Sequence, residues 1–268
     1  MDRTGERRRS ASAAVPLGRR LLVDRPRRLV LSLVGVGLAL MLVLVLDGIS
    51  AGVDQRVTVF EDQVGADLYV AQPGTRSFLG GTSLVPAATE AAVAATPGVA
   101  WTAPVRAAFS VPMVDGVRVP SFLVGFEPGR PGAPWSVADG RAPAADTEIA
   151  VGHQFAARTG VGVGDEVDLF GHPMTVVGIA GDADMVLASF VFMTHAAAET
   201  VLGSPDTTSF VLVGADDPAA VAASLDAAGL HVVPAATIRA NDLAMKGQAY
   251  TAAVGLLVAI AFGAGTIV

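Results

Sequence analysis

The chain has 268 residues and no cysteine, and it carries a formal net charge of −7 with only 16% charged residues. Its mean hydropathy of +0.55 is too high for an ordinary soluble protein, and the lack of cysteine excludes a disulfide framework and a thiolate metal site. Nine arginines stand against three acidic residues before Leu29, giving this segment a net charge of +6. The segment has no aromatic residue on which a base could stack, so we expect no nucleic-acid partner.

An uncharged apolar run extends from Leu29 to Leu46, in which every residue except Ser32 is apolar or glycine. As a helix, these residues span about 27 Å, close to the thickness of the hydrocarbon core of a bilayer. Arginines precede the run, whereas the chain from Leu29 onward has a net charge of −13. By the positive-inside rule, we expect a cell-membrane protein with a cytoplasmic N-terminus and an extracytoplasmic central domain.

A cleaved signal peptide is the competing interpretation of this run, because Gly48, Ile49 and Ser50 before Ala51 resemble a cleavage site. The apolar run is longer than the core of a signal peptide, and residues 250–268 form a second uncharged apolar segment. We therefore favour an uncleaved anchor. Since the second segment is still apolar at Val268, we expect the chain to be a fragment that ends inside a second membrane helix.

Four regions are predicted along the chain. We expect a disordered basic cytoplasmic tail over residues 1–24, and a transmembrane helix with a stalk over 25–64, because apolar residues recur at helical spacing from Ile49 to Val64. Residues 65–237 are predicted to form an α+β domain, with a β-rich inserted lobe at about 111–185. Residues 238–268 are predicted to form a second stalk and an incomplete second transmembrane helix.

Alternating apolar runs and turn residues give the elements of the central domain. Helices are expected at 86–96, 153–159, 195–202, 218–228 and from 238 onward. Strands are expected at 67–71, 99–114, 117–126, 148–151, 166–170, 174–180, 190–194, 209–213 and 230–233. Asp115-Gly116 predicts a hairpin turn, and residues 128–143, with four prolines and three glycines, predict an irregular connection.

One stretch of the domain carries an ordered set of motifs. Gly140, Arg141 and Pro143 predict a turn before the strand that carries Glu148, and Gly162, Gly164 and Asp165 predict a tight helix-to-strand turn. The stretch ends with Val176, Val177, Gly178 and Ile179. Together, in this order and between two apolar segments, these residues resemble the MacB-like periplasmic core domain of FtsX-like permeases of type VII ABC transporters.

The resemblance covers about residues 25–268 and implies a non-enzymatic permease subunit in which stalk helices connect the membrane to an extracytoplasmic domain of two lobes. It implies a separate cytoplasmic ABC ATPase that binds ATP, a second permease copy, identical or not, and a lipid membrane as partners. Such permeases transmit movement driven by ATP hydrolysis and act in export or extraction of a lipid, lipoprotein or peptide substrate. The alternatives are a membrane-anchored regulator of an envelope enzyme such as a cell-wall hydrolase, and a secreted binding domain.

No catalytic, cofactor or metal site is expected. The sequence lacks a phosphate-binding loop, a nucleophile elbow and a zinc-protease motif, and His153, His172, His195 and His231 lack metal-ligand spacing. Asp182 and Asp184 are interpreted as a solvated loop, because the rest of a calcium loop is missing. Phe78 and Leu79 lie among glycines and serines in residues 74–84, so we expect an exposed loop with apolar tips. The two interpretations of this loop are a mobile loop without a partner, which we favour, and a contact site for a partner.

Overall fold

The computed structural model describes residues 26–185 and 188–245, and the chain divides into two units, residues 1–52 and 53–268. Helix α2 (Pro26–Val57) contains the apolar run, and proline suits its first position. Among the described residues, no helix is long and apolar enough to cross a membrane. The first transmembrane span thus stays a prediction, and the predicted tail at 1–24 and the second apolar segment lie outside the described residues.

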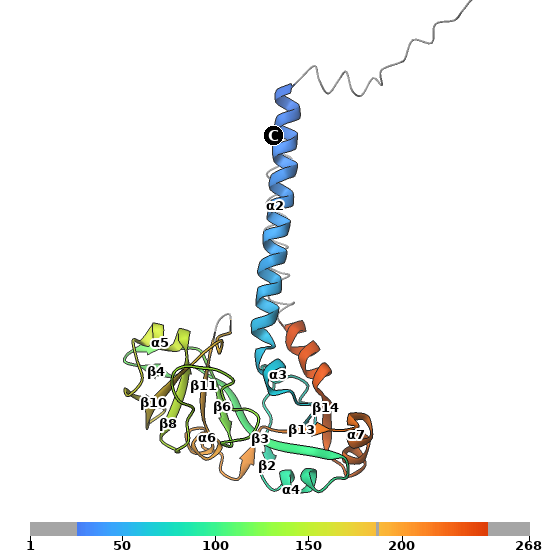
Figure 1. The fold of residues 1–268 in the computed structure, drawn as a ribbon, viewed down its shortest axis with the longest axis vertical. Helices are drawn as coiled ribbons and strands as arrows, with labels where there is room; N and C mark the ends of the chain where they lie inside the picture. Colours follow the sequence, from blue (N-terminus) through green and yellow to red (C-terminus); the bar gives the residue numbers. More distant parts are fainter. Residues whose placement is uncertain (1–25, 186–187, 246–268) are drawn as a thin grey trace, which may run out of the picture. The chain divides into compact units, whose positions relative to one another are not determined.

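A ten-stranded sheet forms the frame of the second unit (Figure 1). Its strand order is β14-β1-β13-β3-β6-β11-β8-β10-β7, with β9 paired to β10. The long strand β3 (Val99–Ser110) joins two lobes, because residues 99–105 pair with β13 and residues 106–110 pair with β6. The other strands of this sheet are β1 (Leu68–Ala71), β6 (Ser121–Phe126), β7 (Val137–Gly140), β8 (Glu148–Gly152), β9 (Glu166–Leu169), β10 (His172–Ala180), β11 (Ser189–Thr194), β13 (Phe210–Ala215) and β14 (His231–Pro234).

The first lobe contains β14, β1, β13 and the first half of β3, which all pair antiparallel. Helices α4 (Thr89–Ala94) and α7 (Pro218–Ala227) supply Val93, Val221 and Leu225 to an aliphatic core against Leu68 and Val211 of the sheet. Asp217 caps α7 by accepting from the Ala220 N–H at 3.1 Å, as predicted from the Asp-Pro pair. A short sheet of β2 (Val85–Pro86) and β12 (Thr207–Thr208) lies beside this lobe.

The second lobe contains the second half of β3 together with β6, β11, β8, β10, β7 and β9. Strands β6 and β11 pair parallel, as do β8 and β10, whereas β8 and β11 pair antiparallel. Helices α5 (His153–Thr159) and α6 (His195–Val201) add Phe155, Ala197 and Ala198 to its core. The small hairpin of β4 (Met113–Val114) and β5 (Val117–Arg118) turns at Asp115 and Gly116, which both have positive φ, so the hairpin prediction is confirmed.

Most predicted elements are present with shifted ends, and the larger differences have physical causes. Residues 128–143 were predicted to be irregular but contain β7, which pairs with β10 at the edge of the sheet. Because this short strand is mostly exposed, its sequence has no apolar run that would predict a strand. Pro86 was predicted to begin a helix but lies in β2, and α4 begins only at Thr89. The predicted bounds of the inserted lobe, about 111–185, are too narrow, because β11 and α6 pack in the same core as β8 and β10.

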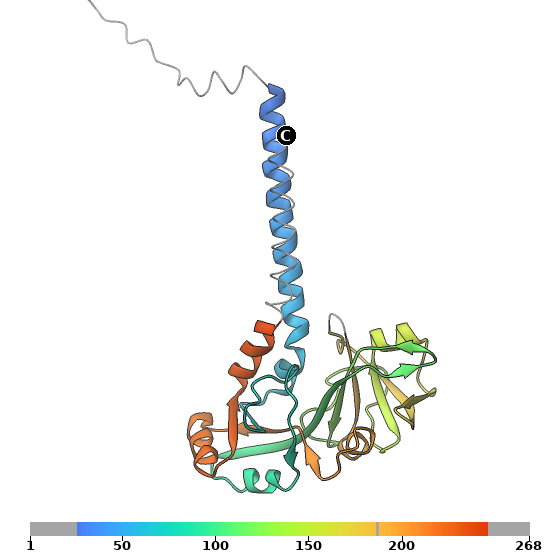
Figure 2. The ribbon, with the colours of Figure 1, turned by 180° about the vertical axis from the view of Figure 1, so that it is seen from behind.

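The first and last described helices of the second unit lie next to each other. A bend at Thr58 separates α2 from α3 (Val59–Val64), and Gly65 ends α3 in the left-handed conformation that the sequence predicts. After β14, residues 235–245 form a helix. Figure 2 shows this helix, in red, next to α3 and the end of α2. We call α3, residues 72–84 and helix 235–245 the junction.

Candidate functional site: the junction of the terminal helices with the core

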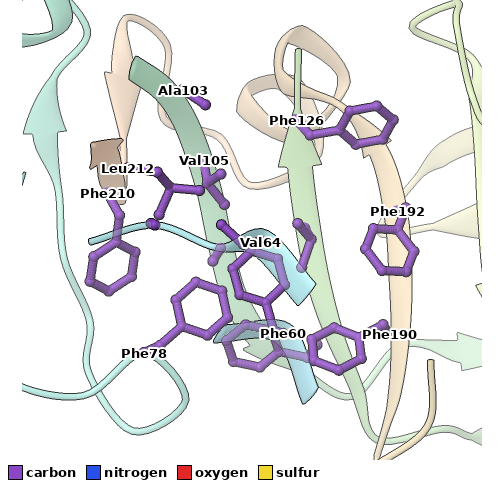
Figure 3. Close-up of a cluster of buried hydrophobic side chains, with 14 of the residues drawn as sticks. Phe60, Val64, Phe78, Ala103, Val105, Phe126, Phe190, Phe192, Phe210 and Leu212 are labelled. Carbon is purple, nitrogen blue, oxygen red and sulfur yellow. The ribbon is translucent and has the colours of Figure 1, made fainter. Parts of the chain in front are cut away.

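Apolar packing attaches α3 to both lobes. Phe60 is fully buried and stacks on Phe78 with a centroid distance of 4.2 Å and an interplanar angle of 6°. Figure 3 shows Phe60 and Val64 pointing among side chains from the two halves of the sheet. Phe60 also contacts Phe190 of the second lobe, at a centroid distance of 6.1 Å. Phe60 therefore packs in a core to which both lobes contribute side chains.

Polar contacts connect the two terminal helices at the surface. Arg239 of helix 235–245 forms an ion pair with Asp62 of α3, and Asp62 also accepts a hydrogen bond of 2.9 Å from the Thr58 hydroxyl. The Asn241 side chain donates to the Arg76 carbonyl at 2.8 Å. Both members of the ion pair are partly solvated, with exposed side-chain fractions of 51% and 37%, so its contribution to stability is small. The ion pair nevertheless connects helix 235–245 to α3.

Two acidic side chains are buried where these helices meet. Glu61 of α3 is 7% exposed and Asp242 of helix 235–245 is 1% exposed. Asp242 accepts hydrogen bonds from the Ser77 hydroxyl, from the Phe78 N–H at 2.9 Å and from the Leu79 N–H at 3.3 Å. Residues 77–79 are thereby connected to helix 235–245.

Burial governs the electrostatics of this site. The apolar surroundings, and next the Asp242 carboxyl beside it, raise the pKa of Glu61 to about 9 from an ordinary value of 4.5. Burial also raises the pKa of the Tyr69 phenol on β1, with the charges of Glu61 and Asp242 adding to the effect. Burial and the neighbouring acid thus both favour the protonated form of Glu61.

The last turn of α2 contacts the second lobe directly. The Arg56 guanidinium donates to the Asp184 carbonyl oxygen at 3.3 Å. The Asp184 carboxylate accepts from the Gln154 N–H at 3.1 Å and from the Ser189 hydroxyl at 2.6 Å. Asp184 is only 8% exposed, so its interpretation as part of a solvated loop was wrong. Instead, its side chain fastens the segment before β11 to the start of α5.

The predicted motif residues form a structural corner of the second lobe. Gly140 has φ +75°, and a Cβ there would lie 2.2 Å from the Val177 carbonyl oxygen. A Cβ on Gly178 would lie 2.2 Å from the Arg141 carbonyl oxygen. Arg141 forms an ion pair with Glu148, whose carboxylate also accepts from the Ala144 N–H at 3.0 Å. Because of the Arg141 hydrogen bond, the pKa of Glu148 falls to about 2.

The second part of the motif lies beside this corner. The Gly162 N–H donates to the Asp165 carboxylate at 2.7 Å, and the Gly164 N–H donates to the Val176 carbonyl at 2.7 Å. Gly164 has φ +99°, a conformation that favours glycine. Pro143 is buried in the turn before β8. The motif thus joins β7, β8 and β10, and it lies apart from the contacts that form the junction.

The prediction that Phe78 and Leu79 form exposed apolar tips was wrong. Phe78 is fully buried between Phe60 and Phe210, and Leu79 is partly buried against the same cluster. Serine and glycine surround Phe78 because the backbone of this loop must approach Asp242 closely, and not because the loop is solvated. Among the described residues, the exposed apolar side chains of the domain lie mainly in the second lobe, on Phe109, Met113 and Phe170.

The histidines are dispersed over the described part of the domain. His195 lies 3.8 Å from Glu199, and burial lowers its pKa. His231 contacts the Thr75 carbonyl at 3.1 Å. Across residues 26–185 and 188–245, no cluster of three or more histidine, cysteine or acidic side chains is placed to hold a metal ion.

Comparison with known proteins identifies relatives of this architecture. The model of the MacB-like periplasmic core domain matches residues 29–228. An uncharacterized ABC transporter permease of Mycobacterium tuberculosis is 32% identical over 197 residues, which cover 71% of this chain and 54% of that protein. An uncharacterized ABC transporter permease of Mycobacterium bovis is 32% identical over 161 residues, covering 59% and 44%. The chain spans about half the length of these curated relatives.

Two solved structures resemble the domain. The extracellular domain of the noncanonic ABC-type transporter YknZ from Gram-positive bacteria has a TM-score of 0.47 and 14% identity, covering 63% of this chain and 98% of that one. The periplasmic region of MacB from Actinobacillus actinomycetemcomitans has a TM-score of 0.48 and 11% identity, covering 66% and 91%.

Proposed function

Since the chain belongs to the family of MacB-like periplasmic core domains, we propose that it is the anchoring and extracytoplasmic part of an ABC transporter permease. In this proposal a separate cytoplasmic ATPase hydrolyses ATP, and the terminal helices transmit the resulting movement to the two lobes. The movement serves export or extraction of a lipid, lipoprotein or peptide. The membrane location, with the N-terminus in the cytoplasm and the domain outside, and the second permease copy are parts of the same proposal.

The junction is the observation that carries this proposal. Both terminal helices attach at one place, where Phe60 packs against both lobes and Asp242 ties helix 235–245 to residues 77–79. Arg56 adds a direct contact with the segment before β11. A helix transmits displacement as a rigid element, and a packed core responds to such displacement by rearranging its contacts. Relative motion of the terminal helices therefore has a route into each lobe.

A crosslink across the junction tests the proposal. The chain has no cysteine, so Asp62→Cys with Arg239→Cys provides a unique thiol pair where the surface ion pair lies. The protein is purified in mild detergent with its bound subunits, and ATP hydrolysis is measured before and after treatment with a short bifunctional thiol reagent. We expect an ATPase subunit to co-purify, and its coupled activity to fall severalfold on crosslinking.

The matched control places the crosslink at another surface ion pair, with Arg141→Cys and Glu148→Cys, which lies within a single lobe. This crosslink should leave ATP hydrolysis unchanged. Absence of an ATPase subunit after purification would contradict the permease assignment. Recovery of an envelope hydrolase whose activity depends on this chain would instead support the regulatory alternative. Full activity of the complex with a crosslinked junction would contradict transmission through these helices.

A further inference from the structure

Glu61 and Asp242 are an unusual pair because both are acidic, both are buried, and they come from the two different terminal helices. Glu61 directly follows Phe60, which stacks on Phe78 at a centroid distance of 4.2 Å, and the Phe78 N–H donates to Asp242, so both carboxyl groups belong to the same contact between α3 and helix 235–245. After burial, the Asp242 carboxyl is the next cause that raises the pKa of Glu61. Two ionised carboxylates in one contact repel each other, and burial strengthens the repulsion. The ionisation of this pair therefore decides whether α3 and helix 235–245 attract or repel each other at this point.

The two carboxyl groups have unequal surroundings. Asp242 accepts three hydrogen bonds from residues 77–79, which satisfy a negative charge. Neither carboxyl oxygen of Glu61 receives a hydrogen bond from the residues that the structure describes. Burying a carboxylate without a donor or a cation is costly, whereas a protonated carboxyl can donate to an acceptor. The Asp242 carboxylate is that acceptor, so the proton belongs on Glu61.

The other charged groups near the pair do not supply a cation to Glu61. Arg239 is paired with Asp62 at the solvated rim, and Arg56 donates to the Asp184 carbonyl. On β14, His231 contacts the Thr75 carbonyl. The titratable side chains whose charges act on Glu61 are Asp242 across the junction and Asp62 on the same helix. Glu61 and Asp242 in turn raise the pKa of the buried Tyr69 phenol on β1.

A metal ion is a poorer ligand for this site than a proton. Within the described ranges, no group of three or more suitable side chains surrounds a common point. Asp242 already accepts hydrogen bonds that a metal ion would displace. One proton satisfies both carboxyl groups at once, because it removes the charge from Glu61 and gives Asp242 a further donor.

We propose that Glu61 and Asp242 form a proton-binding site that fastens α3 to helix 235–245, and that the proton leaves when the junction opens to water. Opening hydrates Glu61 and separates it from Asp242, which removes both causes of its proton affinity. The coupling is reciprocal, since a change that alters proton affinity must itself be altered by proton binding. The consequence for transport depends on the proposed function, whereas the proton site itself does not.

The direction of the pH dependence follows from the raised pKa. Glu61 binds its proton more tightly in the folded chain, so the stability gained from the proton is fully present below the ordinary pKa near 4.5. It is lost progressively as the pH rises through about 9. Between these two pKa values the unfolded chain releases a proton that the folded chain keeps. The folding equilibrium constant therefore falls about tenfold for each unit of pH increase.

Infrared spectroscopy of the full chain in detergent detects the proton directly. A protonated carboxylic acid has a C=O stretching band that an ionised carboxylate lacks. We expect such a band at about pH 7, its loss at about pH 10, and its absence at both pH values in Glu61→Gln. Glu148→Gln is the matched control, because Glu148 is ionised at both pH values and its loss should leave the band unchanged. A band that persists in Glu61→Gln would overturn the assignment.

Hydrogen exchange at residues 77–79 tests whether the proton fastens the junction. The Phe78 and Leu79 N–H groups donate to Asp242, so their protection reports on the position of helix 235–245. Relative to an unstructured peptide at the same pH, we expect protection to fall at least tenfold in wild type between about pH 7 and about pH 10. Glu61→Gln, which keeps an amide donor, should show no such fall. An equal fall in both proteins would refute the fastening role.

These readouts separate the proton site from the transport proposal. If the ATPase is missing or its activity is unaffected by the crosslink, but the infrared band of wild type is present, the proposed function is contradicted and the proton site is supported. If the permease is functional but no band depends on Glu61, the proton site is contradicted and the proposed function is supported.

Discussion

The junction and the motif corner of the second lobe use charged residues in opposite ways. At the corner, Arg141 and Glu148 are seven residues apart in sequence and pair at the surface. At the junction, Asp242 and Phe78 are 164 residues apart and their contact is buried. Local, exposed pairing is visible in a sequence because turn residues fix it. Distant, buried pairing depends on the completed fold, and in this chain it carries the candidate functional site.

The two regions also differ in how their stability arises. The corner depends on backbone geometry, since Gly140 and Gly178 leave space for facing carbonyl oxygens that any side chain would fill. The junction depends on side-chain burial, with Phe60 and Phe78 stacked inside an aromatic cluster that reaches both lobes. Substitutions that remove volume should therefore act most strongly at the junction, and substitutions that add volume should act most strongly at the corner.

Phe60→Ala should produce the largest effect. The change removes a fully buried ring that touches Phe78 and Phe190, and we expect it to lower the free energy of unfolding by about 3–5 kcal/mol. Urea denaturation of the full chain in detergent measures the change. The matched control is Phe109→Ala in the second lobe, where the ring is 58% exposed and the loss should stay within about 0.5 kcal/mol. Equal losses would show that the aromatic cluster does not stabilise the junction.

Gly140→Ala should have an intermediate effect and tests the corner. Gly160 has nearly the same φ, +77° against +75°, but a Cβ at Gly160 meets nothing within 4 Å. Gly160→Ala should therefore cost only the left-handed backbone conformation, about 1–2 kcal/mol. Gly140→Ala adds the contact with the Val177 carbonyl and should cost about 1–3 kcal/mol more. Thermal unfolding compares the two variants. Equal losses of stability would show that the close approach of the Val177 carbonyl does not explain the glycine at position 140.

Arg141→Gln should have the smallest effect and a pH signature. It removes the hydrogen bond that lowers the pKa of Glu148, so this pKa should return toward its ordinary value. A depressed pKa contributes stability above the ordinary value, and this contribution is lost as the pH falls toward about 2. Wild type should thus be slightly more stable than the variant at neutral pH and equal to it in strong acid. A carboxyl titration by NMR measures the pKa, and an unchanged Glu148 would contradict the pairing.

Much of the fold was predictable because short stretches of adjacent residues determine it. The Asp115-Gly116 turn, the Asp217 cap of α7 and the glycine that ends α3 all depend on backbone preferences of a few adjacent residues. β7 was missed because Val137–Gly140 is mostly exposed at an edge and lacks an alternating pattern. The extent of the second lobe was missed because β11 joins it through pairing with β6 and β8, which no local feature of β11 specifies.

The candidate site was not predicted, although one signal of it was present. Asp242 follows Ile238 by four residues, so both lie on one face of a helix, and Ile238 is fully buried. An acidic residue on an apolar helical face indicates a buried polar contact that needs a partner. Glu61, next to Phe60, gave no comparable signal, because an acidic residue in a short helix is ordinarily solvated. Phe78 was misread for the converse reason, since its polar neighbours suggested exposure.

The sequence by itself indicated the family, through the resemblance of its motif residues to the MacB-like periplasmic core domain. It also determined the mixed α and β architecture, the order of most elements and the turns of the motif corner, which follow from composition, periodicity and turn chemistry within a few residues. Only the tertiary structure decided which side chains join α3 to helix 235–245, that Phe78 is the buried partner of Phe60, and that two acids share one apolar site. The physical reason is that burial and the pairing of distant side chains are properties of the folded sheet, whose two halves both contribute side chains to the core around Phe60.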